Sequence, residues 1–401
     1  MQQQILIIGA GFGGLWSALS AVRLLDQQQR LDVRVTLLAP QAELRVRPRF
    51  YETDLASTVA PLGPLLDAVD VRFVQGTATQ IDAANKRVTY HEASGTQAEL
   101  GYDRLILAAG SRVARPALAG IEGFNFDVDS LESAQELEAH LRSLRQQPES
   151  PARNTVVVVG GGFTGIETAT EMPARLRAIL GDQSDIRVIV VDTAKQVGGA
   201  MGQAIATIVA EASESLGVTW KLGSPVAQVD EQGVWLGNGE RIEASTVIWA
   251  VGVKASPLTQ QIAGERDPHG RLHVDRNLKV LGQDAIYATG DTAYAAVDDQ
   301  GNHALMTCQH AIGLGRSAGN NAAADLIGVE PIAYNQPKYV TCLDLGGWGA
   351  VFTEGWERKV LLTGQEGKAL KTQINTQWIY PPLADRATAL AAADPLIPVV
   401  A

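Results

Sequence analysis

The feature that most constrains the fold of this chain is an apolar strand that runs directly into a glycine-rich turn near its first residue. Residues 5–8 are Ile-Leu-Ile-Ile, and Gly9, Gly11 and Gly14 follow. Gly9 permits a sharp turn, Gly11 allows backbone N–H groups to approach a pyrophosphate, and Gly14 allows the next helix to lie close to the strand. A helix over residues 15–25 would direct its positive N-terminal end at the phosphates. The pattern therefore predicts a dinucleotide-binding site.

A second copy of the same pattern begins at Thr155. Four valines lead into Gly160, Gly162 and Gly165, and the next predicted strand ends at Asp192. A carboxylate at that place accepts hydrogen bonds from a free ribose 2′-hydroxyl and repels a 2′-phosphate, which favours NADH over NADPH. Since chance must produce the same context twice, two copies indicate dinucleotide binding far more specifically than one.

The first copy lacks the acid that the second copy has. Its second strand, residues 33–38, is followed by Ala39, and the nearest acidic residue is Glu43. Loss of one such contact costs about 1–3 kcal/mol if a hydroxyl is left buried and unpaired. A large cofactor with many other contacts tolerates that loss, so we expect the site to remain.

Three arginines then alternate around a proline. Arg45, Arg47 and Arg49 flank Pro48 in an otherwise acidic protein. In one interpretation they form a cationic rim beside the cofactor, which stabilises negative charge on a reduced ring or orients an anionic substrate. In the other they pair with surface carboxylates, and each pair contributes about 0–1 kcal/mol. The sequence leaves both interpretations open.

Small residues follow three further predicted strands. These strands lead to Ala109 and Gly110, to Gly252, and to Gly290 and Asp291. Open α/β sheets bind cofactors at the carboxyl ends of their strands, so small residues leave room there and Asp291 can accept hydrogen bonds from cofactor hydroxyls. Residues 71–74 and 87–90 are instead expected to form a small antiparallel layer.

Composition excludes several classes of partner. The chain has 401 residues and a net charge of −11, which disfavours nucleic acid as a partner. Its two cysteines, Cys308 and Cys342, form no CxxC pair, so we expect no metal site and no disulfide framework. No cysteine lies near the three arginines, which argues against a disulfide-reductase mechanism. No run of 18 uncharged apolar residues is present, and we expect a cytoplasmic protein.

The motifs GAGFGG, a strand ending in AAG, GGGFTGIE, WAVGVKASP and YATGD occur in this order. Together they resemble those of flavoprotein reductases with two dinucleotide-binding domains, and most of all type II NADH:quinone oxidoreductases, over roughly residues 1–355. The resemblance implies an α/β fold with two Rossmann-like domains. The FAD domain would comprise residues 1–115 and 272–330, the inserted NADH domain residues 116–271, and an acceptor-site or interface region residues 331–401.

The resemblance also implies roles for individual residues. FAD would be held by Gly9, Gly11, Gly14, Ala109, Gly110, Gly290 and Asp291, and NADH by Gly160, Gly162, Gly165 and Asp192. Three residues would act near the reaction: Pro48 beside the isoalloxazine, Glu167 in proton handling or nicotinamide orientation, and Gln309 in the acceptor site. The implied reaction passes hydride from NADH to FAD and then to a quinone or quinone-like small aromatic acceptor.

The acceptor-site pattern departs from that of the family. The family pattern Ala-Gln-x-Ala-x-Gln aligns with residues 308–313, where Cys308 replaces the first alanine, Gln309 is retained and Gly313 replaces the second glutamine. His310 is either a proton donor or a packed side chain. Two alternatives therefore stay open. One is a soluble NADH-dependent reductase of another acceptor, either ferredoxin or a small molecule. The other is a redox sensor that binds FAD and NADH without turnover.

The C-terminal region carries only a short amphipathic stretch. Lys368, Lys371 and Trp378 belong to it, and Pro381 with Pro382 interrupts it. Stable bilayer binding requires a large apolar face with cationic residues, so we expect weak or no membrane association. Peripheral attachment to the inner face of a membrane and a homodimer are left open.

Overall fold

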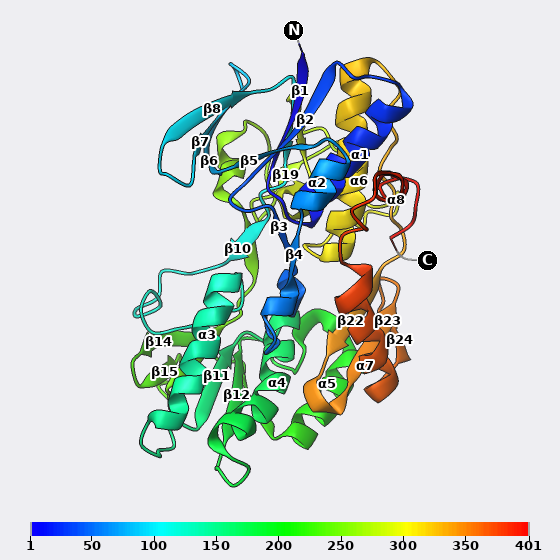
Figure 1. Ribbon diagram of the computed structural model, residues 1–401. Coiled ribbons are helices and arrows are strands. Elements are labelled where there is room, and N and C mark those ends of the chain that lie inside the picture. Colours follow the sequence, from blue (N-terminus) through cyan, green and yellow to red (C-terminus); the bar gives the residue numbers. More distant parts are fainter. Residues whose placement is uncertain (1, 400–401) are drawn as a thin grey trace.

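The computed structural model describes residues 2–399 and contains two parallel sheets, one for each glycine loop (Figure 1). The upper sheet in Figure 1 has five strands in the order β20-β9-β1-β2-β5. In that order the strands are Ile286–Ala288, Arg104–Leu107, Gln3–Ile8, Val33–Ala39 and Arg72–Gln75. Strand β20, late in the sequence, pairs with β9 from the first third of the chain, so this domain is discontinuous in sequence.

Alternate side chains of β1 face two different layers. Ile5 and Ile7 pack under helices α1 (Phe12–Gln27) and α6 (Cys308–Ile327). Leu6 and Ile8 pack on the opposite face, against an antiparallel sheet. That sheet consists of β6 (Thr77–Asp82), β7 (Arg87–His91) and β8 (Gln97–Gly101). Because both faces are buried there, residues 5–8 of the strand are all apolar rather than alternating.

Helices α1 and α6 lie unusually close together. A Cβ added at Gly315 would lie 2.6 Å from the carbonyl oxygen of Gly13, and one at Gly319 would overlap the backbone of Ser17. The Ser17 hydroxyl also donates to Gly315 O at 3.1 Å. These glycines bring the two helices into backbone contact, which fixes helix α6 against the first glycine loop.

The lower sheet repeats the design. Its four strands have the order β13-β12-β11-β17 and comprise Val218–Leu222, Arg187–Asp192, Thr155–Val159 and Thr246–Trp249. Helices α3 (Leu131–Ser143), α4 (Phe163–Leu180) and α5 (Gln203–Leu216) accompany it. Val156 and Val158 pack towards helices α3 and α4, whereas Val157 and Val159 pack towards a three-stranded sheet. That sheet contains β14 (Val226–Asp230), β15 (Gly233–Leu236) and β16 (Arg241–Glu243).

Short elements connect the two halves. Strands β10 (Ser111–Val113) and β18 (Val253–Ala255) pair antiparallel where the chain passes from one domain to the other and back. The other short elements are β3 (Glu43–Arg45), β4 (Val59–Pro61), α2 (Gly63–Ala68), β19 (Leu272–His273) and β21 (Ala293–Tyr294).

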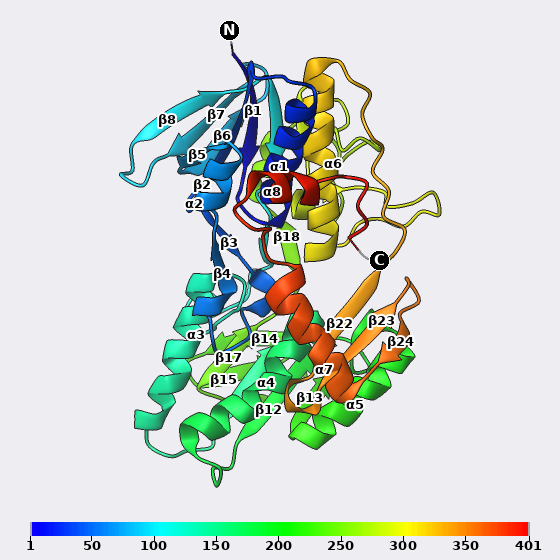
Figure 2. The ribbon, with the colours of Figure 1, turned by 45° about the vertical axis from the view of Figure 1, so that its right-hand side comes forward.

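The C-terminal region spans both halves (Figure 2). Strands β22 (Val340–Asp344), β23 (Ala350–Glu354) and β24 (Lys359–Leu362) form an antiparallel sheet next to helix α7 (Gly364–Gln373). Leu343 and Val351 of this sheet pack against α4 and α5 of the lower domain. The chain then returns to the upper domain, where Leu390 of helix α8 (Arg386–Ala392) joins the core around α1. Within residues 2–399, no helix is long and apolar enough to cross a bilayer.

One sequence prediction about this fold is wrong. Residues 71–74 were expected in the antiparallel layer, but β5 pairs parallel to β2 and forms the edge of the five-stranded sheet. The short helix α2 supplies the crossover that a parallel pair needs. Six residues with one proline gave too weak a helical pattern to reveal it.

Candidate active site

The first glycine loop has the geometry that its sequence predicts. Gly9 has φ +106°, which favours glycine, and a Cβ on Gly14 would overlap the Gly9 carbonyl oxygen. By contrast, a Cβ on Gly11 would meet nothing within 4 Å. Gly9 and Gly14 are therefore required by the fold, whereas Gly11 borders open space at the N-terminus of α1, where a pyrophosphate fits.

The second loop matches the first at its three key glycines. Gly160 has φ +107°, a Cβ on Gly165 would overlap the Gly160 oxygen, and Gly162 again borders open space. An alanine directly follows the neighbouring strand in each sheet, β9 or β17: a Cβ on Gly9 would overlap Ala108 O, and one on Gly160 would lie 2.6 Å from Ala250 O. Both loops thus form the same cradle, which supports two dinucleotide sites.

Asp192 lies at the second loop, as predicted. Its carboxylate accepts a hydrogen bond from Gly161 N and another from Ala194 N at 2.6 Å. These bonds hold the carboxylate at the carboxyl end of β12, beside the indole of Trp220. The geometry places a fixed negative charge where an adenosine ribose would bind.

Asp291 follows Gly290, which lies close to the first glycine loop where α1 begins. Gly290 has φ +60°, and a Cβ on Gly290 would lie 3.9 Å from the Cα of Gly13. The Ser111 hydroxyl donates to the Asp291 carboxylate at 2.6 Å. Ser111 follows Gly110, which has φ +65°. The predicted residues from strands β9 and β20 therefore converge with the glycine loop on one edge of the upper sheet.

Arg47 and Arg49 of the arginine segment make different kinds of contact. Arg47 forms an ion pair with Asp129, lies 3.7 Å from Asp291, and donates to Ser111 Oγ at 2.8 Å, so it borders the first dinucleotide site. Arg49 is buried and binds Glu52 and the backbone of Ser57. Its contacts are structural, although Arg49 is buried and is not the exposed ion pair of the second interpretation.

The other members of this segment lie at its margin. Arg45 pairs with Glu132 at 2.7 Å and with Glu43 at 3.3 Å, so Glu43 is engaged by an arginine on its own strand. Pro48 lies half-buried in a short 3₁₀ turn between Arg47 and Arg49. At the end of β2, the carbonyl oxygen of Ala39 accepts a hydrogen bond from Gly76 N at 2.9 Å. This strand therefore ends without the acidic side chain that ends β12.

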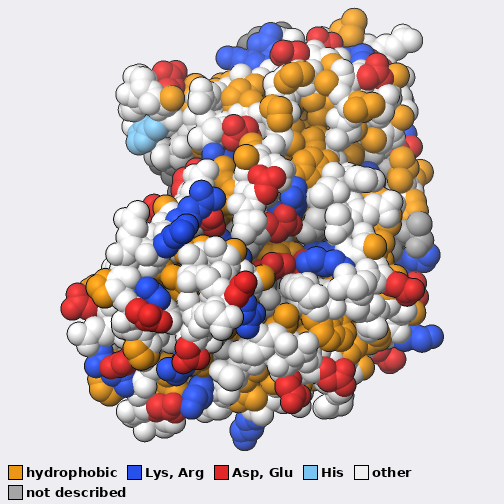
Figure 3. All heavy atoms as spheres, turned by 60° about the horizontal axis from the view of Figure 1, so that its bottom comes forward, with side chains coloured by type: hydrophobic (Ala, Val, Ile, Leu, Met, Phe, Trp, Pro, Cys, Tyr) orange, Lys and Arg blue, Asp and Glu red, His pale blue; other side chains and the backbone are white. Residues whose placement is uncertain are grey.

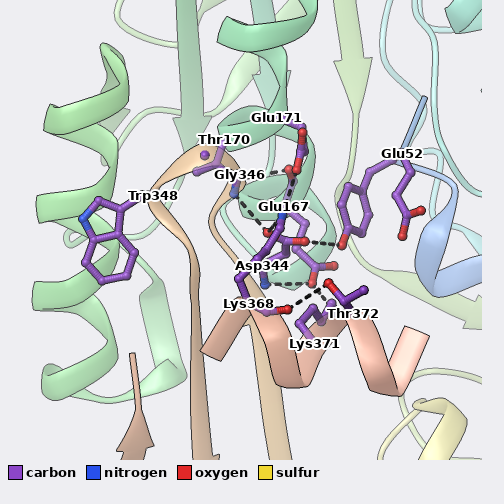
Figure 4. Close-up of polar contacts among 12 residues, drawn as sticks. Glu52, Glu167, Thr170, Glu171, Asp344, Gly346, Trp348, Lys368, Lys371 and Thr372 are labelled. Carbon is purple, nitrogen blue, oxygen red and sulfur yellow. Dashed lines mark hydrogen bonds and ion pairs between the residues drawn. The ribbon is translucent and has the colours of Figure 1, made fainter. Parts of the chain in front are cut away.

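Glu167 lies on α4, one turn beyond the second loop, and is buried (Figure 4). Its carboxylate accepts hydrogen bonds from Lys371 Nζ at 2.7 Å and from Asp344 N at 3.1 Å. Burial raises the pKa of Glu167 despite the attraction of Lys371. Burial opposes the positive charge of Lys371, but the neighbouring Glu167 carboxylate outweighs this effect and raises the pKa of Lys371. The two groups therefore retain protons to higher pH than they would in water.

A chain of polar contacts links this pair to the surface. Asp344 accepts from Tyr51 OH at 2.9 Å and from Lys368 Nζ at 2.6 Å, and Lys368 also reaches Glu171 at 3.2 Å. The side chains of Lys368 and Glu171 are 30% and 23% exposed, compared with 6% for Asp344. Lys368 and Glu171 are therefore the members of this network that reach solvent, and burial raises the pKa of Glu171 as well.

Sequence reasoning identified Glu167 but missed its partners. The sequence places Lys368 and Lys371 in an amphipathic stretch and gives no sign that Asp344 contacts Glu167. The spacing of the two lysines was the available signal, because residues three apart lie on one face of a helix. That face meets α4 only in the folded protein, since 204 residues separate Lys371 from Glu167.

Gln309 and His310 begin helix α6. The Gln309 amide donates to Val340 O at 2.7 Å and accepts from Val340 N at 3.4 Å. Both polar groups of this side chain are therefore bonded to the backbone of β22. His310 is fully buried, stacks on Tyr339 and bonds Thr307 Oγ1 at 2.9 Å. Burial lowers the pKa of His310 to about 4. His310 is thus a packed neutral side chain rather than a proton donor at neutral pH.

Two separate parallel sheets, each with a glycine cradle, define a two-domain oxidoreductase with separate sites for FAD and a nicotinamide dinucleotide. Residues 3–315 match the model of the pyridine nucleotide-disulphide oxidoreductase family. The chain belongs to this family. It is an oxidoreductase, and FAD and NADH are its cofactors.

Relatives support this assignment. The chain is 45% identical over 401 residues to an NADH dehydrogenase-like protein of Mycobacterium tuberculosis, covering 98% of each chain. It is 29% identical over 299 residues to the demethylphylloquinone reductase of Synechocystis, covering 72% of each. Among solved structures, NDH2 of Plasmodium falciparum in complex with NADH has a TM-score of 0.78 at 15% identity, with 98% of both chains covered. This last similarity establishes the fold alone.

Proposed function

We propose that this protein passes electrons from NADH to a quinone or a quinone-like small aromatic acceptor. The observation that carries the proposal is the buried pair of Glu167 and Lys371, which lies where helix α4, behind the NADH loop, meets the C-terminal region. Relatives named for quinone or phylloquinone reduction support it.

The proton balance gives this pair a task. NADH gives up two electrons and one proton as a hydride, whereas a quinone takes up two electrons and two protons. The protein must therefore deliver one further proton to the acceptor. Burial raises the pKa of Glu167, which favours uptake of a proton by its carboxylate, and Lys371 orients that group through Oε1. The exposed end of the chain, at Lys368 and Glu171, allows the proton to be replaced from water.

The glycine cradles fit the two cofactors. We propose that FAD is held by Gly9, Gly11, Gly14, Ala109, Gly110, Gly290 and Asp291, with Pro48 beside the ring, and NADH by Gly160, Gly162, Gly165 and Asp192. Bound FAD supplies the hydride acceptor and the electron donor that amino-acid side chains lack. The chain's own task is to bind, orient and exclude water: Asp291 is fixed by Ser111, and Asp192 by two backbone N–H groups.

The cysteines argue against a disulfide as the acceptor. Cys308 and Cys342 are free thiols. Burial raises the pKa of Cys308, and it raises that of Cys342 to about 11. Because the thiolate is the reactive form, neither residue is a ready nucleophile at neutral pH.

We further propose weak or no membrane association. The apolar side of α8 is turned inward, since Ala389 and Leu390 are buried against the upper domain. Arg386 also pairs with Asp26 and Asp70, which fixes this segment on the protein. On the face shown in Figure 3, acidic and basic side chains are intermingled, so this face does not carry the basic field that an anionic bilayer or a ferredoxin requires. The formation of a homodimer stays a prediction, which light scattering would test.

Anaerobic stopped-flow absorbance near 450 nm tests the proposal. NADH should bleach the flavin rapidly, NADPH slowly, and menadione should then restore the colour. Rapid bleaching without recovery by menadione would reject a quinone acceptor. Slow bleaching with a stable long-wavelength band would instead indicate a redox sensor.

A further inference from the structure

The order of strands in the upper sheet assigns the two halves of FAD to different places. The pyrophosphate fits the glycine loop after β1, and a dinucleotide fold holds the adenosine ribose at the end of the next strand in the chain, here β2. Strands β9 and β20 lie on the other side of β1 from β2. The flavin half of the cofactor therefore extends over the carboxyl ends of β9 and β20, where Gly110 and Asp291 follow.

Asp291 is held there by a chain of two hydrogen bonds that begins at Arg47. Nη1 of Arg47 donates to Ser111 Oγ at 2.8 Å, and the Ser111 hydroxyl donates to Oδ2 of Asp291 at 2.6 Å. Both directions follow from the chemistry, because a guanidinium can only donate and a carboxylate can only accept. A hydroxyl that accepts from a cation is also a stronger donor. Arg47 therefore fixes the Ser111 oxygen and strengthens its bond to Asp291.

Arg47 is itself anchored by the lower domain. Its Nη2 forms an ion pair with Asp129, directly before the residue that caps helix α3. Oδ2 of Asp129 accepts from Val113 N at 2.9 Å, which holds this carboxylate in place. Nη1 of Arg47 lies 3.7 Å from Asp291, so one guanidinium serves carboxylates of both domains. The side chains of Asp129 and Asp291 are only 16% and 18% exposed, so these contacts are screened less than an ordinary surface pair.

Asp291 keeps one oxygen for the cofactor. Its Oδ2 is used by Ser111, whereas its Oδ1 accepts no hydrogen bond from any group in residues 2–399. We propose that Arg47 is a positioning residue for the flavin half of FAD, which acts through Ser111 to hold the Asp291 carboxylate so that Oδ1 faces a hydroxyl group of the cofactor. This inference rests on the placement of FAD proposed above and not on the identity of the electron acceptor.

The test measures the Kd of FAD for the full-length protein after removal of the flavin, from the quenching of flavin fluorescence. Arg47→Met and Ser111→Ala should each raise this Kd by about tenfold, because each breaks the chain that ends at the carboxylate. The double variant should also bind about tenfold more weakly, since the second change breaks a chain already broken, whereas independent effects would multiply to about a hundredfold. The Ki of ADP as a competitor of FAD should not change, because ADP carries only the adenosine half.

Arg45→Met is the matched control. The Arg45 side chain is 29% exposed, compared with 31% for Arg47, and it also pairs with two carboxylates. Its contacts within the described part of the chain involve neither Ser111 nor Asp291. Replacing Arg45 should therefore leave the Kd of FAD unchanged. The Tm of each flavin-free variant checks that the chain folds.

Asp291→Ala separates this inference from the placement of FAD. If Asp291→Ala leaves the Kd of FAD unchanged, the placement fails and the inference with it. If Asp291→Ala weakens FAD binding but Arg47→Met does not, only the inference fails. The inference also fails if the double variant shows the full product of the two single effects, or if Arg47→Met weakens the binding of ADP as much as that of FAD.

Discussion

The ammonium of Lys371 lies 2.7 Å from the carboxylate of Glu167, and both side chains are less than one-tenth exposed. One group comes from helix α7 and the other from α4, so the contact fastens the C-terminal region to the NADH domain. Removing two charges from water is costly, and the cost is met only while each has its partner. The stability of this junction therefore depends on the protonation states of Glu167 and Lys371.

Replacing Lys371 should expose this coupling. We expect Lys371→Met to lower the free energy of unfolding by about 3–5 kcal/mol at pH 8, because Glu167 keeps a buried charge without a cation. The loss should shrink as the pH falls, since Glu167 then binds a proton. Denaturant unfolding followed by tryptophan fluorescence measures both effects.

Two further variants serve as controls. Adding Glu167→Gln to Lys371→Met should recover most of the loss, because the unpaired charge is gone. Lys221→Met should cost about 1 kcal/mol or less, since Lys221 and its partner Glu240 are both more than one-third exposed and screened by water. Equal losses for Lys221→Met and Lys371→Met would contradict a special role for the buried pair.

The two kinds of glycine in the first loop should respond differently to substitution. Gly14→Ala forces a methyl group into the Gly9 carbonyl and should destabilise even the FAD-free protein, by about 3 kcal/mol. Gly11→Ala meets no atom within 4 Å and should leave the FAD-free protein intact while weakening FAD binding. Flavin absorbance per chain and the Tm of stripped protein distinguish the two, with Gly63→Ala, also in open space, as the control. Normal flavin content in Gly11→Ala would show that this position does not face the cofactor.

Asp192 should determine the choice of nicotinamide cofactor. Asp192→Asn keeps an acceptor for Gly161 N–H but removes the charge, so the preference for NADH over NADPH should fall about tenfold. Flavin reduction rates at varied NADH and NADPH concentrations give the ratio. Asp182→Asn removes an exposed acid from the same domain and should change nothing. An unchanged ratio in Asp192→Asn would assign selectivity to other residues.

How much the sequence could predict depends on the range of the interactions involved. The glycine loops are local, because the strand, turn and helix that define Gly9 and Gly14 lie within a dozen residues, and their geometry follows the pattern closely. Asp192 was also predictable, since it ends the strand next to its own loop. The partners of Glu167 were not, because no local pattern shows that α7 packs on α4.

Departures from the family pattern could be seen in the sequence but not explained there. In the sequence, Gly313 stands where the family pattern has glutamine, so a functional group is missing there. In the folded chain it is a space that Gln336, from a segment 23 residues later, occupies. Similarly, His310 appears as a titratable group at the acceptor site, yet it is fully buried against the rings of Tyr339 and Trp356. Burial decides both cases, and burial at these positions is set by contacts with the C-terminal third of the chain.

The burial of His310 makes stability depend on pH. Its pKa is lowered to about 4 in the folded protein, whereas it is about 6.5 in an unfolded chain. Between these values the unfolded chain binds a proton that the folded protein excludes, so stability is full above pH 6.5 and falls as the pH falls. The slope from this one group reaches at most about 1.4 kcal/mol per pH unit.

Substitution of His310 by Phe should remove this contribution while keeping the stack on Tyr339. The free energy of unfolding, measured by denaturant at pH 7.5 and pH 5, should differ less in His310→Phe than in the wild-type protein. His91→Gln, at an exposed position, should leave the difference unchanged. If His310→Phe retains the full wild-type difference, the acid sensitivity arises elsewhere and His310 is not held neutral by burial.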